Sequence, residues 1–159
     1  MILQAVNLTE VAEFLRICSP ATRIYLGGDS ERVQINRKWY ADYTVAIVVH
    51  IDGCRGCKVF GEVTREPDYD TRKDRPAMRL MNEVYKVAEM YEKLTAIADG
   101  KKVDIHLDIN PNKMHGSSCV IDQAVGYIKG VCMVDAAVKP AAFAASFAAD
   151  RLKRVLSGE

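Results

Sequence analysis

Four acidic residues stand where a carboxylate is costly unless it binds a cation or a proton: Asp29, Glu83, Asp108 and Asp150. Two of them come at the ends of apolar runs, one lies among the apolar positions of a helical pattern, and one follows the nearly uncharged residues 141–149. Carboxylates that gather at one site raise each other's pKa, and a hard cation such as Mg²⁺ or Mn²⁺ relieves their repulsion. If the fold brings the four together, the sequence predicts a divalent-metal site.

Such a cluster of carboxylates has a defined chemistry. Two divalent ions about 3.5–4 Å apart can activate a water molecule and stabilise the leaving oxygen of a phosphodiester. Each acid taken alone also has an ordinary interpretation, as a turn residue, a surface ion pair or the polar end of a helix. Asp29 with Ser30 could begin a turn, and Glu83 could pair with Arg79 or Lys86. The metal interpretation therefore depends on the elements that position the acids.

The first acid follows a short strand. Residues 24–26 are β-branched, aromatic and aliphatic, which favours a buried strand. Gly27 and Gly28 leave room for another group to approach the backbone. We expect this strand to end at Asp29 and the polar residues 30–38 to form a loop.

The rest of the chain alternates between segments with the apolar period of a helix and segments with that of a strand. The order that it predicts is helix, three strands, helix, strand, helix, strand, helix. After the first strand, the expected elements are strands over 39–51 and 57–65, a helix over 76–98, a strand over 103–109, a helix over 118–129, a strand over 131–137 and a helix over 139–156, with a short helix over 7–16 before them. Asp52 and Gly53 signal a hairpin between the second and third strands.

This order predicts an α/β fold with a mixed five-stranded sheet flanked by helices. Its first three strands are antiparallel, and its last two lie parallel to the first because each is reached through a helix. Asp108 then lies at the carboxyl end of its strand, where open α/β sheets bind ligands. We expect Asp29 and Asp108 to lie on neighbouring parallel strands, close enough to share one cation. At 100° per residue, Glu83 falls on the apolar side of its helix.

Length and composition limit the possible classes. With 159 residues, the chain predicts one domain, with an N-terminal helix over 1–20 and a core over 21–159. A net charge of +1 means that any contact with nucleic acid must depend on a local patch. Neither a signal peptide nor an apolar run long enough to span a bilayer is evident in the sequence, so we expect no membrane partner. Five cysteines fit a reducing cytoplasm.

The order of elements and the places of the four acids resemble the ribonuclease H-like nuclease fold. Four stretches are similar to the YkuK-like family of predicted ribonuclease H-related nucleases: IYLGGDS, HLDINPN, AVGYIKG and FAASFAADR. The resemblance covers nearly the whole chain. It implies that Asp29, Glu83, Asp108 and Asp150 are catalytic and hold two Mg²⁺ or Mn²⁺ ions.

Three functions remain open at this point. The first is a nuclease acting on RNA, an RNA–DNA hybrid or structured DNA, with RNA or a hybrid as the favoured partner. The second is a non-catalytic module of the same fold that binds nucleic acid or protein. The third is a 3′–5′ exonuclease that uses Asp29 and Glu31, but the His or Tyr that such enzymes need before the last acid is replaced here by Phe143 and Phe147.

Several other residues are candidates for contacts with a substrate. We assign substrate binding to Ser30, Asn110, Lys139, Arg75 and Arg79, and possible proton transfer to His115. The ordinary interpretations are a solvated charged face and a loop histidine.

Cys54 and Cys57 have the spacing of metal ligands. Structural zinc needs four ligands, and the sequence offers no second cysteine pair. We therefore expect these two thiols to bind no structural metal.

Overall fold

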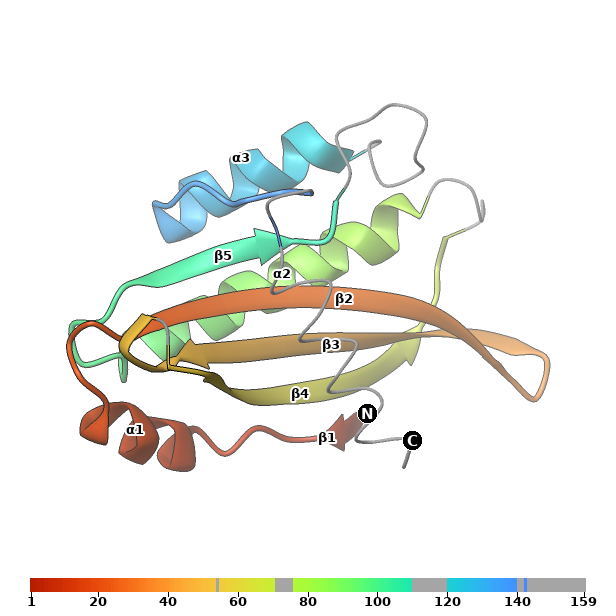
Figure 1. Cartoon of the computed structure of the whole chain (residues 1–159). Coiled ribbons are helices and arrows are strands. Elements are labelled where there is room, and N and C mark those ends of the chain that lie inside the picture. Colours follow the sequence, from red (N-terminus) through yellow and green to blue (C-terminus); the bar gives the residue numbers. More distant parts are fainter. Residues whose placement is uncertain (54, 71–75, 110–119, 140–141, 143–159) are drawn as a thin grey trace.

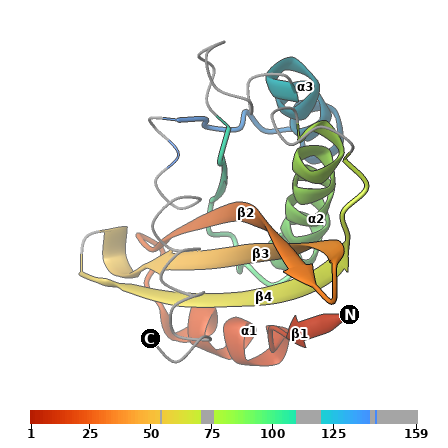
Figure 2. The ribbon, with the colours of Figure 1, turned by 90° about the vertical axis from the view of Figure 1, so that its right-hand side faces the viewer.

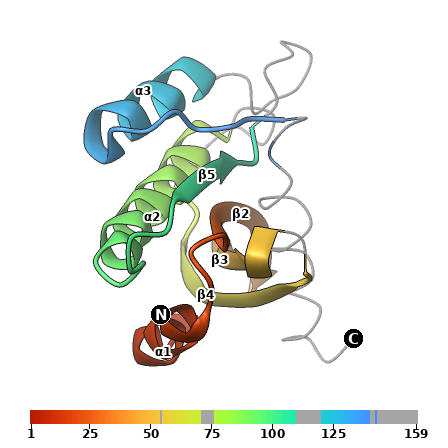
Figure 3. The same cartoon turned by 60° about the vertical axis from the view of Figure 1, so that its left-hand side comes forward.

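The computed structural model describes residues 1–53, 55–70, 76–109, 120–139 and 142. They form a five-stranded sheet in the order β1-β4-β3-β2-β5, with α2 and α3 packed together beside β5 and α1 beside β4 (Figure 1). The elements are β1 (Ile2–Gln4), α1 (Leu8–Ile17), β2 (Arg23–Ile35), β3 (Lys38–His50), a turn (Ile51–Gly53), β4 (Cys57–Pro67), α2 (Ala77–Thr95), β5 (Val103–Leu107) and α3 (Ile121–Cys132). Figures 2 and 3 show α1 beside β4 and α2 beside β2 and β5, with α3 beyond α2.

The β2–β3 hairpin differs from the prediction. The expected strand end at Asp29 and loop over 30–38 are wrong, because β2 continues to Ile35 and pairs with β3 along its whole length. Asn36 and Arg37 form a two-residue turn with φ of 51° and 66°, as the favoured hairpin turns require. Residues 30–35 are largely polar because other parts of the fold cover them only partly. This polarity led to the prediction of a loop.

The fifth strand of the sheet is also not the expected one. Residues 131–137 do not form a strand, because α3 passes Gly130 and continues to Cys132. Ala124, Ile128 and Cys132 repeat every four residues and bury one face of that helix, so the apolar run belongs to a helix. Only Ala137 pairs with the sheet, through a parallel bridge to His106. The fifth strand is β1, which pairs antiparallel with β4.

The predicted crossover between β2 and β5 is confirmed. β5 lies parallel to β2, with Gly28 opposite Leu107 at the last paired position. In the described part of the chain β5 is the one strand parallel to β2, so the expected pair of parallel strands is half correct. The expected C-terminal helix over 139–156 lies outside the described residues except for Lys139 and Ala142. Among the described helices, none is both long and apolar enough to cross a bilayer.

A close approach of α2 to β2 builds the core. A Cβ added to Gly28 would lie 2.6 Å from Cγ2 of Val87 and 3.2 Å from Cγ of Glu83. Real Cβ atoms essentially never come as close to another heavy atom as the Val87 distance, and the Glu83 distance is also unusually short. The prediction that a group would lie against the glycines is therefore confirmed at Gly28.

Gly28→Ala should destabilise the fold by about 1–3 kcal/mol, because the added methyl group overpacks a filled interface. Gly126→Ala is the matched control, since nothing lies within 4 Å of a Cβ there and the residue is within α3. Alanine is the better helix former by about 1 kcal/mol, so the control should be neutral or more stable. Urea unfolding of the three proteins measures both changes. Equal effects of the two substitutions would mean that α2 does not touch β2 at Gly28.

Candidate active site

Asp29 and Asp108 lie side by side. Gly28 pairs with Leu107 in parallel register, so the next residues on the two strands are these acids. Successive residues of a strand point to opposite faces, and Gly28 faces α2. Both acids therefore share the face of the sheet turned away from α2. The two acids therefore occupy neighbouring positions at the ends of paired parallel segments, as expected.

The pKa of Asp108 reflects this proximity. Burial is the largest cause that raises the pKa of Asp108, and the charge of Asp29 and a side-chain hydrogen bond to it raise that pKa further. The ammonium of Lys139, with Nζ 2.6 Å from Oδ1, acts in the opposite direction. Two acids of like charge that are partly withdrawn from water would gain from a shared cation.

Glu83 approaches β2 from the side that faces α2. It is 2 % exposed, and its Oε2 accepts a hydrogen bond of 2.7 Å from Oγ of Ser30. Burial raises the pKa of Glu83 to about 8, helped by the charges of Asp29 and Asp108, while the Ser30 hydrogen bond and the charge of Arg79 lower it. The helical periodicity predicted this burial correctly.

Ser30 and Arg79 connect the acids. Nη1 of Arg79 donates to the carbonyl oxygen and to Oγ of Ser30, at 2.9 and 3.0 Å. The backbone N–H of Ser30 donates to Oδ1 of Asp29 at 2.8 Å. Ser30 therefore contacts Asp29 through its backbone and Glu83 through its hydroxyl.

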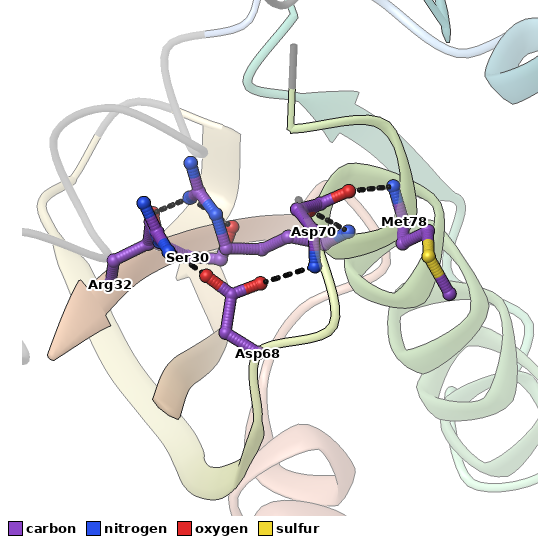
Figure 4. Close-up of polar contacts among 6 residues, drawn as sticks. Ser30, Arg32, Asp68, Asp70 and Met78 are labelled. Atoms are coloured by element: carbon purple, nitrogen blue, oxygen red, sulfur yellow. Dashed lines mark hydrogen bonds and ion pairs between the residues drawn. The ribbon is translucent and has the colours of Figure 1, made fainter. Parts of the chain in front are cut away.

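The start of α2 is held in place by an acid that sequence reasoning did not identify. Asp70 accepts hydrogen bonds from the backbone N–H groups of Met78 and Arg79, at 2.9 and 2.8 Å, and Asp68 pairs with Arg32 of the hairpin (Figure 4). The cap comes from eight residues before Met78, so the usual capping pattern does not reveal it.

The acids fit a hard cation in kind, because carboxylate oxygens are the ligands that Mg²⁺ and Mn²⁺ prefer. Asp29 and Asp108 supply them from one face. Glu83 reaches the opposite side of β2, and its carboxyl is bonded to Ser30. Accordingly, no three His, Cys, Asp or Glu residues within the described part of the chain form a group that could hold a metal ion. Asp150 lies outside that part.

Some of the remaining candidates contact the acids or Ser30, and others lie outside the described residues. Arg79 contacts Ser30, and Lys139 contacts Asp108, as described above. Glu31 is exposed on the same face as Asp29. Cys57 is an exposed free cysteine at the start of β4. The other candidates lie outside the described residues: Asn110, His115, Arg75 and Cys54.

The mixed sheet, the crossover helix and the acids at the end of its parallel strands define a class of α/β domains that place carboxylates at one edge of a sheet. The model of the ribonuclease H-like family matches residues 8–154, and the chain belongs to that family. The resemblance seen in the sequence is thus confirmed. Comparisons with curated proteins and with solved structures give no significant match. Membership in the family supports a nuclease or a related nucleic-acid-binding module.

Glu83→Gln should flatten the dependence of stability on pH. The pKa of Glu83 is raised from 4.5 to about 8, so between these values the folded protein keeps a proton that the unfolded chain loses. The metal-free wild type should therefore lose stability as pH rises through this range, at up to about 1.4 kcal/mol per pH unit, and the variant should not. Denaturant unfolding in EDTA, from about pH 5 to about pH 8.5, measures this.

Glu89→Gln is the control for this experiment. Glu89 lies on the exposed side of α2 and pairs with Lys93 at 3.2 Å, so its substitution should keep the wild-type profile. A Glu83→Gln profile as steep as that of wild type would mean that Glu83 is already ionised in the folded protein.

Proposed function

We propose that this protein is a divalent-metal-dependent nuclease that hydrolyses phosphodiester bonds in RNA, RNA–DNA hybrid or structured DNA. The observation that carries the proposal is the pair of carboxylates, Asp29 and Asp108, at adjacent parallel strands. The buried Glu83 is close enough for both charges to raise its pKa. A module that only binds nucleic acid gains nothing from acids that repel one another and repel phosphates.

Each residue has a role in this proposal. Asp29 and Asp108 would supply oxygen ligands, and Asp150 would add to them. Glu83 would bind the same ions only after its carboxyl leaves Ser30. Two Mg²⁺ or Mn²⁺ ions held by these acids would supply an activated water molecule and stabilisation of the leaving oxygen. Ser30 and Arg79 hold Glu83 in place through the hydrogen bonds described above.

The proposal includes the wider setting of the site. The chain acts as a single domain over residues 1–159 in the cytoplasm, with nucleic acid as its partner. Substrate contacts come from Ser30, Arg79 and Lys139, and from Asn110 and Arg75. His115 assists proton transfer.

Asp29→Asn and Asp108→Asn should each lower nuclease activity by at least about 100-fold, because each keeps the shape of the side chain and removes the charge that holds an ion. The assay uses end-labelled single-stranded RNA, RNA–DNA hybrid and branched DNA with Mg²⁺ or with Mn²⁺. Labels at both ends distinguish internal cleavage from 3′–5′ trimming, which would favour the exonuclease with Asp29 and Glu31. Folded wild-type protein that binds these substrates and cuts none of them would identify the non-catalytic module instead.

Without metal, Asp29→Asn should be as stable as wild type or slightly more stable, since it removes one repelling charge. Asp108→Asn also loses the ion pair with Lys139, so its stability should stay close to that of wild type. Mn²⁺ should raise the melting temperature of wild type through ligand linkage, and should do much less for either variant. Thermal melts with and without Mn²⁺ measure both effects. Equal shifts in all three proteins would contradict a metal site at these acids.

A further inference from the structure

A cavity of about 510 Å³ opens between the first half of α2 and the carboxyl end of β4. Its size is in the range of pockets that hold small organic ligands. Tyr43 lies at its buried side, and Tyr69 and Tyr85 line it with 68 % and 44 % of their surface exposed. Aromatic rings that stay exposed at the walls of a cavity offer flat faces on which another ring can stack.

The polar groups of this cavity favour a ligand that donates a hydrogen bond. Glu66 accepts hydrogen bonds from Nζ of Lys86, at 2.8 Å, and from the amide of Asn82. The Lys86 hydrogen bond is the largest cause that lowers the pKa of Glu66, so the group is a carboxylate at neutral pH. Each carboxylate oxygen keeps a further lone pair, which can accept an N–H from a ligand. The same negative charge repels a phosphate.

The cavity adjoins the candidate active site at Arg79. Arg79 lines the cavity, and its Nη1 contacts Oγ of Ser30, which in turn donates to Glu83. Figure 4 shows Ser30 on β2 and the capped start of α2 at Met78, between which this contact lies. One arginine side chain therefore links the cavity to Ser30 and, through Ser30, to Glu83.

We propose that this cavity binds one unpaired nucleobase of the substrate strand, stacked on Tyr69 and Tyr85, with an amino group of the base donating to Glu66. Glu/Asp acceptors recognise the exocyclic amino group of cytosine in this way, and adenine and guanine carry amino groups too. The phosphates stay outside, on the side of Arg79. The inference rests on the proposed function and narrows its substrate to strands with an unpaired nucleotide beside the scissile bond.

The test is the binding of 12-nucleotide fluorescent oligonucleotides in EDTA, by anisotropy, at one fixed salt concentration. Tyr69→Ala should weaken binding of single-stranded oligo(C) and oligo(A) by about 5- to 150-fold, since stacking of a base contributes about 1–3 kcal/mol. Tyr69→Phe keeps the ring and should bind as wild type does. A blunt duplex offers no free base, so its binding should not respond to Tyr69→Ala.

Glu66→Gln tests the donor independently of stacking. Wild type should prefer oligo(A) and oligo(C) over oligo(U), which has no amino group. The preference should be smaller in the variant, because its neutral amide oxygen is a weaker acceptor and its NH₂ group can donate to uracil. Met133→Ala removes an apolar side chain that is 82 % exposed and does not line the cavity, so it should change nothing. Thermal melts confirm that each variant is folded.

The inference and the proposed function fail in different ways. Because EDTA prevents metal-dependent cleavage, binding reports on the cavity even if no substrate is ever cut. Unchanged affinity of Tyr69→Ala for single strands, or wild type that binds no oligonucleotide, would overturn the base pocket. Cleavage that persists in such a case would leave the nuclease standing.

Discussion

The fold and its site depend on the close contact between α2 and β2 at Gly28. The place that a Cβ would take is occupied by the side chains of Val87 and Glu83. This contact carries the carboxyl of Glu83 into the interior, where the loss of water raises its pKa. Ser30 and Arg79 compensate part of that loss with a hydrogen bond and a positive charge. One absent side chain therefore sets both the distance between strand and helix and the protonation of the acid between them.

The parts of the site that the sequence predicted follow from local periodicity. Alternation along a strand placed Asp108 at a sheet edge, and 100° steps placed Glu83 on the buried side of a helix. The rule that strands joined through a helix lie parallel then favoured Asp29 and Asp108 as neighbours. These rules concern backbone geometry, which is why they held although the ends of several elements were misjudged.

The parts that were missed depend on contacts between distant residues. Val131 and Cys132 sit in a short apolar run that suits a strand or a buried helix, and packing decides in favour of the helix. β1 is three residues long and exists because it pairs with β4, while the N-terminal amine donates to the carbonyl of Arg65 at 2.9 Å. Asp29 and Glu83 lie on opposite sides of β2 because Asp29 is inside this strand and not at its end. The polar residues after Asp29 concealed that the strand continues.

The ion pair between Lys139 and Asp108 changes how metal affinity should be understood. Nζ of Lys139 lies 2.6 Å from Oδ1 of Asp108, and the backbone N–H of Lys139 is held by the carbonyl of Ile109 at 3.1 Å. The protein thus carries its own cation, tethered beside a carboxylate that a divalent ion would need. Loading such a site is an exchange of one cation for another, and its free energy is the difference between two attractions. The ammonium that leaves Asp108 would then be released at the edge of the site, where the phosphates of a bound strand can become its next partner.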